Sequence, residues 1–162
     1  MTAKRLLNLT VNDLIIKIKG NVGLGQFAFE RSKFEGWLKV EIIDILFKKN
    51  INAKPEINRI DVTFKDTAIE LKTINTNYRF NNVKNKKRPI TKNIKGILKD
   101  ISDLKRKVTK NKFVIFIVFP VIVNNSYWAI HIHKIQKELS ELTFKEFKFN
   151  NSIPGLIYYG KL

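Results

Sequence analysis

The sequence predicts an α/β fold in which one domain holds a central mixed β-sheet flanked by helices. Three segments support this prediction. Residues 91–108 place apolar side chains at helical spacing, and residues 113–123 form a continuous apolar run typical of a strand buried on both faces. Residues 59–73 alternate apolar and polar side chains, as the strands of a hairpin do. With 162 residues the chain can bury a core of its own, so we treat residues 1–162 as a single domain.

Two helices are expected before the hairpin. The first covers residues 4–18, and the glycines at 20, 23 and 25 predict a flexible loop after it. The second runs from Ser32 to about Lys49 and carries its apolar residues on one stripe. Ser32 is expected to be the N-cap of this helix, with Glu35 three residues later as its capping-box partner.

The hairpin is expected to lead into a loop and a third helix. Residues 51–57 are predicted to be extended, and the hairpin strands are placed at 59–64 and 68–73. Residues 75–93 are polar, basic and without a hydrophobic period, which predicts a mobile loop. The helix over 91–108 then buries one face, and its other face is rich in lysine.

The last third of the chain begins with the strand at 113–123, which we expect at the centre of the sheet. The elements expected after it are a turn at 124–126, a strand at 127–133, a short helix at 134–142 and edge strands at 143–149 and 156–159. On a strand, His131 and His133 would share one face. With no third ligand near them in the sequence, we interpret both as surface or packing residues.

Composition limits the function classes that this chain can serve. It has no cysteine, which excludes disulfides, cysteine-ligated zinc, iron–sulfur clusters and thiol nucleophiles. Its 31 Lys and Arg against 14 Asp and Glu leave a net charge of +17. Such an excess favours a polyanionic partner, most simply nucleic acid, although a generally basic composition is the alternative.

The distribution of apolar residues predicts no membrane span. The longest apolar run, residues 113–123, has eleven residues and contains Pro120, whereas a spanning helix needs about 20. The first 20 residues interrupt their apolar side chains with polar ones and lack the uninterrupted core of a signal peptide. We therefore expect a cytoplasmic protein.

Acidic residues in the hairpin are candidates for a metal site. If Lys65 and Asp66 form a two-residue turn, Asp61 lies directly opposite Glu70. Two opposed carboxylates repel each other unless a cation lies between them, and Mg²⁺ is typically held by one or two carboxylates. A four-residue turn would instead place Asp61 opposite Lys72 as an ordinary ion pair. The hairpin pattern leaves both arrangements open.

The same residues resemble a known motif. Asp61 followed by Glu70-Leu71-Lys72 on the next strand, after a helix that carries Glu35 and Glu41, resembles the core motif of the PD-(D/E)xK nucleases, the restriction-endonuclease-like superfamily. The resemblance covers residues 34–121 in the order helix, hairpin, amphipathic helix and buried strand. This chain departs from the pattern at Ile60, where the motif has its proline.

The resemblance implies a role for each motif residue. Asp61 and Glu70 would coordinate Mg²⁺, or Mn²⁺ in its place, with the backbone carbonyl of Leu71 as a further ligand. Lys72 would orient the attacking water or help to deprotonate it. Either Glu35 or Glu41 would complete the carboxylate set, and the assignment between them stays open. We prefer Glu35, and Glu41, six residues further along the helix, points about 120° away from it.

A cluster of positive charge follows the hairpin. Between residues 84 and 112 the sequence has twelve Lys or Arg against two Asp. Such a cluster suits a phosphate backbone, and its alternative is a solvated surface. The residues expected to contact nucleic acid are Arg79, Lys84, Lys86, Lys87, Arg88, Lys92, Lys95 and Lys99.

These features together predict a Mg²⁺-dependent DNA endonuclease. A homodimer is expected, because two copies of a small domain can cut two strands at symmetric positions. The DNA substrate is either a structure, as for a Holliday junction resolvase, or a duplex site, as for a restriction enzyme. The alternative function is a non-catalytic, basic nucleic-acid-binding protein in which Asp61, Glu70 and Lys72 form only an ion-pair network.

Overall fold

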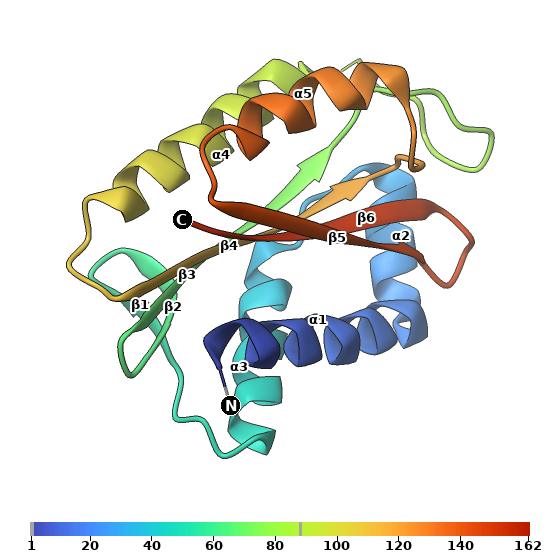
Figure 1. The fold of residues 1–162 in the computed structure, drawn as a ribbon. Coiled ribbons are helices and arrows are strands. Elements are labelled where there is room, and N and C mark those ends of the chain that lie inside the picture. Colours follow the sequence, from blue (N-terminus) through green and yellow to red (C-terminus); the bar gives the residue numbers. More distant parts are fainter. Residues whose placement is uncertain (1, 88) are drawn as a thin grey trace.

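The computed structural model describes residues 2–87 and 89–162 and contains a six-stranded mixed sheet covered by helices on both faces (Figure 1). This arrangement confirms the predicted fold class. The elements in chain order are α1 (Ala3–Gly20), α2 (Val22–Glu30), α3 (Glu35–Lys48), β1 (Lys54–Ile57), β2 (Ile60–Phe64), β3 (Thr67–Asn75), α4 (Ile90–Lys105), β4 (Asn111–Phe119), α5 (Ser126–Gln136), β5 (Glu141–Lys148) and β6 (Pro154–Lys161).

The strands lie in the order β1-β2-β3-β4-β6-β5. β3 and β4 are parallel and joined by α4, and the other neighbours pair antiparallel. Residues 113–119 of β4 are all buried, as predicted for the central strand. The strand ends at Phe119 rather than at residue 123, because Pro120 has no N–H to donate to the sheet.

Two hydrophobic layers hold the sheet. On one face, α1, α2 and α3 pack against side chains such as Leu71 and Ile115. The other face of the sheet is covered by α4 and α5 (Figure 1). Beneath these helices the rings of Phe116 and Tyr158 stack with centroids 4.9 Å apart. Strand side chains alternate between the faces, so Glu70 and Lys72 fall on the side opposite that of Leu71. That side is the one that α4 covers.

The loop predicted at residues 20–25 is wrong, because these glycines lie at the end of α1 and in α2. Asn21 ends α1 and caps α2, where its Oδ1 accepts from the N–H of Leu24 at 3.0 Å. A Cβ atom at Gly25 would collide with the side chain of Asn150. This glycine therefore permits close packing rather than flexibility.

The predicted capping box is also wrong. α3 begins at Glu35, after Phe34, and Ser32 lies outside the helix, where its N–H donates to the carbonyl of Phe27. The Glu35 carboxylate accepts instead from the N–H of Thr73 at 3.0 Å. A tertiary contact to β3 has replaced the local cap.

Residues 127–133 form a helix rather than the predicted strand, and β5 replaces the end of the helix predicted at 134–142. Asn125 caps α5 by accepting from the N–H of Trp128 at 3.0 Å. Two residues apart on a helix, His131 and His133 point in different directions and do not share a face. β6 lies between β4 and β5, so only β5 is an edge strand at this end of the sheet.

The predicted helix at 91–108 ends early. α4 stops at Lys105, so Val108, expected on its buried face, is fully exposed. The described residues between β3 and α4 contain no helix or strand, in keeping with the predicted loop. Within the part of the chain that the structure describes, no helix is long and apolar enough to cross a membrane.

Candidate active site

The register of the β2–β3 hairpin decides how the acidic residues meet. Phe64 pairs with Thr67 and Val62 with Ile69, which leaves Lys65 and Asp66 as the two turn residues. Lys65 adopts the left-handed backbone conformation, with φ of 49°. Extended by one pair, this register sets Asp61 opposite Glu70, and it contradicts the alternative with Asp61 opposite Lys72.

Two carboxylates accept from backbone N–H groups of β3 beyond Ile69, the last residue of β3 that pairs with β2. β2 begins at Ile60, whereas β3 continues to Asn75. In place of a strand, Asp61 Oδ2 accepts from the N–H of Leu71 at 2.8 Å, and Glu35 Oε1 accepts from the N–H of Thr73 at 3.0 Å. Asp61 and Glu35 are therefore held in a row along one edge.

The side chains of Asp61 and Glu70 lie within hydrogen-bonding reach of each other. Burial raises the pKa of Glu70 to about 8, and its hydrogen bond to Asp61 adds to the rise. Burial also acts to raise the pKa of Asp61, but hydrogen bonds with Lys39, the Leu71 N–H and Glu70 outweigh it and lower that pKa. At neutral pH, Glu70 is thus the protonated partner that donates to ionised Asp61.

Two lysines flank this pair. Lys39 of α3 lies 2.9 Å from Asp61 Oδ1 and 2.7 Å from Glu56 Oε1, and Lys72 of β3 lies 2.9 Å from Asp100 Oδ2. Burial acts to lower the pKa of Lys72, but the hydrogen bond to Asp100 and the nearby carboxylates raise it overall. Lys72 therefore stays a cation and suits an electrostatic role better than that of a base.

Sequence reasoning missed Asp100 and Lys39. Asp100 lies on α4, which packs over β3, and Lys39 lies on α3 beneath the hairpin. The only signal for Asp100 was an acidic residue within a segment dominated by lysine. Neither residue belongs to the motif, and only the packing of their helices brings them to it.

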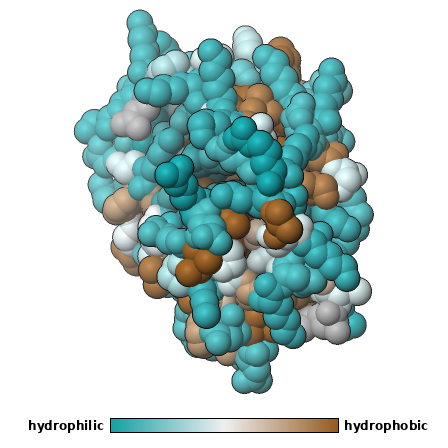
Figure 2. Space-filling view, turned by 90° about the vertical axis from the view of Figure 1, so that its left-hand side faces the viewer, coloured by the Kyte–Doolittle hydropathy of each residue, from teal (hydrophilic) through white to brown (hydrophobic). Residues whose placement is uncertain are grey.

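Glu70 opens into a cleft with a volume of about 580 Å³. Two further carboxylates, Asp100 and Asp103, lie in this cleft, and the basic residues that line it are Arg59, Lys99, Arg106 and Lys107. The side of the molecule that carries the β1–β2 hairpin and the end of α4 is mainly hydrophilic (Figure 2). The cleft thus combines carboxylates with a basic rim, which suits a phosphate group approaching an acidic site.

The donor set fits a hard divalent cation bound by few protein ligands. No group of three or more acidic or histidine side chains within residues 2–87 and 89–162 is arranged to hold a metal. The Asp61–Glu70 pair does offer carboxylate oxygens in contact, which suits Mg²⁺ because this ion keeps several of its waters. Glu35 contacts β3 beside the pair, whereas Glu41 forms an ion pair with Lys17 of α1.

The predicted nucleic-acid contacts divide into two groups. Lys84 and Lys86 pair with Glu30 at 3.0 and 3.4 Å, and Lys99 pairs with Asp103 at 2.6 Å. The residues that are exposed and form no salt bridge with the described part of the chain are Arg79, Lys87, Lys92 and Lys95. Arg88 lies outside the described residues.

A buried arginine anchors the loop between β3 and α4, which we call the basic loop, and sequence reasoning missed it. Arg31 is completely buried, and its guanidinium donates to the carbonyl oxygens of Thr76, Tyr78 and Lys84. Its own carbonyl accepts from the side-chain amide of Asn75. Both ends of the stretch from 76 to 84 are therefore tied to the end of α2.

Comparisons of this chain with protein-family models, with curated proteins and with solved structures found no match.

Proposed function

We propose that this protein is a metal-dependent endonuclease that hydrolyses phosphodiester bonds in DNA, with Mg²⁺ or Mn²⁺ as its cofactor. The observation that carries the proposal is the contact between Asp61 of β2 and Glu70 of β3, beside the cationic Lys72. The order α3, β2–β3 hairpin, α4 and β4 supports the resemblance to the PD-(D/E)xK nucleases.

Asp61, Glu70 and the backbone carbonyl of Leu71 would hold the metal ion. When bound there, a divalent cation lowers the pKa of a coordinated water and neutralises negative charge on the scissile phosphate. Glu70 must lose its proton to act as a ligand, and the ionised Asp61 beside it is ready to bind.

Lys72 would stabilise the negative charge that develops on the phosphate during attack by water. Asp100, 2.9 Å away, holds the ammonium group in position and keeps it protonated. Glu35 holds β3 through the N–H of Thr73 and thereby supports the strand that carries Glu70 and Lys72. The basic residues at the rim of the cleft would offset the repulsion between phosphate and carboxylates.

The substrate and the assembly are parts of the same proposal. A junction, as for a Holliday junction resolvase, or a duplex site, as for a restriction enzyme, suits a small domain that works as a homodimer. Access to DNA fits a cytoplasmic location.

Cleavage assays with matched variants test this proposal. Four-way junctions, plasmid and single-stranded DNA are incubated with the wild type, Asp61→Asn and Glu70→Gln in Mg²⁺, Mn²⁺ or EDTA. We expect the wild type to cut at least one substrate with metal, and both variants to lose cleavage but keep DNA binding, because phosphate contacts do not depend on the carboxylates. The control is Glu146→Gln, which replaces an exposed carboxylate of β5, and this variant should cut DNA normally.

One outcome would replace the proposal with its alternative. If the wild type binds these DNAs but cuts none of them in either metal, the protein is a non-catalytic nucleic-acid-binding protein. The contacts of Asp61 with Lys39 and of Lys72 with Asp100 would then be a structural ion-pair network.

A further inference from the structure

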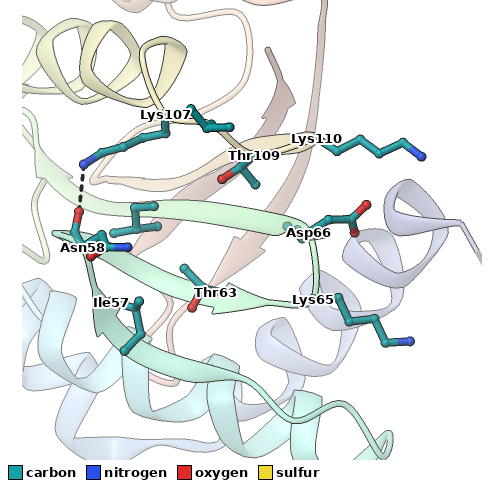
Figure 3. Close-up of a pocket in the computed structure, with 11 residues that line it drawn as sticks. Ile57, Asn58, Thr63, Lys65, Asp66, Lys107, Thr109 and Lys110 are labelled. Atoms are coloured by element: carbon teal, nitrogen blue, oxygen red, sulfur yellow. Dashed lines mark hydrogen bonds between the residues drawn. The ribbon is translucent and has the colours of Figure 1, made fainter.

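A second cavity adjoins the Glu70 cleft. It has a volume of about 580 Å³ and lies between the β1–β2 hairpin, the β2–β3 turn and the connection from α4 to β4 (Figure 3). We call it the hairpin groove, and the residues that line it are Ile57, Asn58, Ile60, Thr63, Lys65, Asp66, Thr67, Lys107, Val108, Thr109 and Lys110. Lys107 lines both the groove and the cleft. The two cavities are therefore neighbours on one side of the molecule.

Positive charge in the hairpin groove is not neutralised by ion pairs. Lys65 and Lys110 lie on either side of Asp66, and Lys107 donates to the carbonyl of Asn58 at 2.8 Å (Figure 3). None of these three lysines forms a salt bridge with the residues that the structure describes, and Asp66 is the one acidic residue among the described residues that line the groove. The groove thus keeps a net charge of +2 available to a ligand, taking three lysines against one aspartate.

Part of the positive charge of the basic loop is already paired. Lys84 and Lys86, which the sequence placed among the DNA contacts, both pair with Glu30. A phosphate bound there would have to compete with an existing carboxylate. In the groove a phosphate would meet three lysines that have no carboxylate partner among the described residues, although Lys107 also donates to the carbonyl of Asn58.

The lining of the groove suits a sugar–phosphate backbone better than bases. Thr63, Thr67 and Thr109 offer hydroxyl groups, and the fully exposed Val108 offers an apolar contact. The described residues that line the groove include no aromatic ring on which a base could stack. Contacts of this kind position a strand without reading its sequence.

We propose that the hairpin groove binds the phosphate backbone of the DNA strand that enters the Glu70 cleft, with Lys65, Lys107 and Lys110 as its main contacts. The inference rests on the proposed function where it treats the Glu70 cleft as the site of DNA cleavage. The binding of DNA phosphates by the groove does not depend on that function. It moves the principal phosphate contacts from the basic loop to the side of the molecule that carries the cleft. Binding by this groove is independent of DNA sequence.

The salt dependence of duplex binding in EDTA tests the groove without any cleavage. Removal of one phosphate contact should reduce the slope of log affinity against log salt by about 0.9, so replacing the three groove lysines with alanine should reduce it by up to about 2.7. The matched control removes the same charge from the basic loop through Lys84→Ala, Lys86→Ala and Lys87→Ala, and should change the slope less.

The possible results test phosphate binding by the groove and the proposed nuclease activity independently. An unchanged slope in the groove variant, a larger reduction in the loop variant, or no duplex binding by the wild type would each overturn the groove. A reduced slope in a protein that never cuts DNA supports the groove and contradicts the nuclease. Normal DNA cleavage by the groove variant, together with an unchanged slope, supports the nuclease and contradicts the groove. Thermal melts of all variants establish that they are folded.

Discussion

Replacing Glu70 with glutamine should stabilise the protein at alkaline pH when no metal is present. At neutral pH the protonated Glu70 donates to Asp61, and a glutamine amide can donate the same hydrogen bond. Once the pH exceeds the pKa of Glu70, the wild type places two negative charges in contact, whereas Glu70→Gln places only one. The two proteins should therefore differ in the pH dependence of their stability.

The shifted pKa of Glu70 sets the direction and the size of this effect. Its pKa is about 8 in the folded protein and 4.5 in the reference state, so the folded state binds more protons between these values. The associated stability is fully present below pH 4.5 and is lost as the pH rises through 8. Each pKa unit corresponds to about 1.36 kcal/mol, but water reaches this half-buried carboxyl and screens it, so we expect about 1–2 kcal/mol.

Thermal melts in EDTA measure the difference. At about pH 5 the wild type and Glu70→Gln should melt together, and at about pH 9 the variant should melt higher by about 2–4 °C for each kcal/mol. Mg²⁺ should raise the melting temperature of the wild type and affect the variant much less, because a ligand stabilises only the state that binds it. Glu146→Gln serves as the control and should follow the wild type throughout.

A variant that melts at or below the wild type at about pH 9, together with a wild type that shows no response to Mg²⁺, would refute the reasoning. It would mean that Glu70 is ionised and supported by a nearby cation in the folded protein. The paired-carboxylate site would then have no basis.

Two further perturbations test the neighbours of this pair. Lys72→Ala should lower the cleavage rate about 100-fold or more and leave the salt dependence of DNA binding unchanged, whereas unaltered cleavage would limit Lys72 to its ion pair with Asp100. Arg31→Met should lower the free energy of unfolding in urea by at least about 3 kcal/mol, because it leaves buried carbonyl oxygens without donors. It should also speed proteolysis within residues 76–87, and equal digestion of the two proteins would contradict the anchoring role of Arg31.

Local patterns predicted the centre of the fold well and its two ends poorly. Two patterns each fit a single arrangement. The alternation of residues 59–73 is that of strands whose side chains point in turn to the two faces of a sheet, and the apolar run at 113–119 is that of a strand buried on both faces. The local conformational preferences of the residues in α2 and α5 gave wrong predictions for both helices. Glycines that signal a loop were required for close packing at Gly25, and residues with strand preference formed α5 because packing against Tyr158 buried Trp128.

The sequence by itself determined that Asp61 faces either Glu70 or Lys72, because the length of a short turn sets the register of a hairpin. It also determined that a basic segment follows the hairpin. Only the tertiary structure selected Glu70 as the partner and decided which lysines keep their charge free, since Glu30 reaches Lys84 and Lys86 whereas the groove lysines meet no such partner among the described residues. Ion pairs of this kind join residues distant in the chain, and helix packing rather than local preference brings their side chains together.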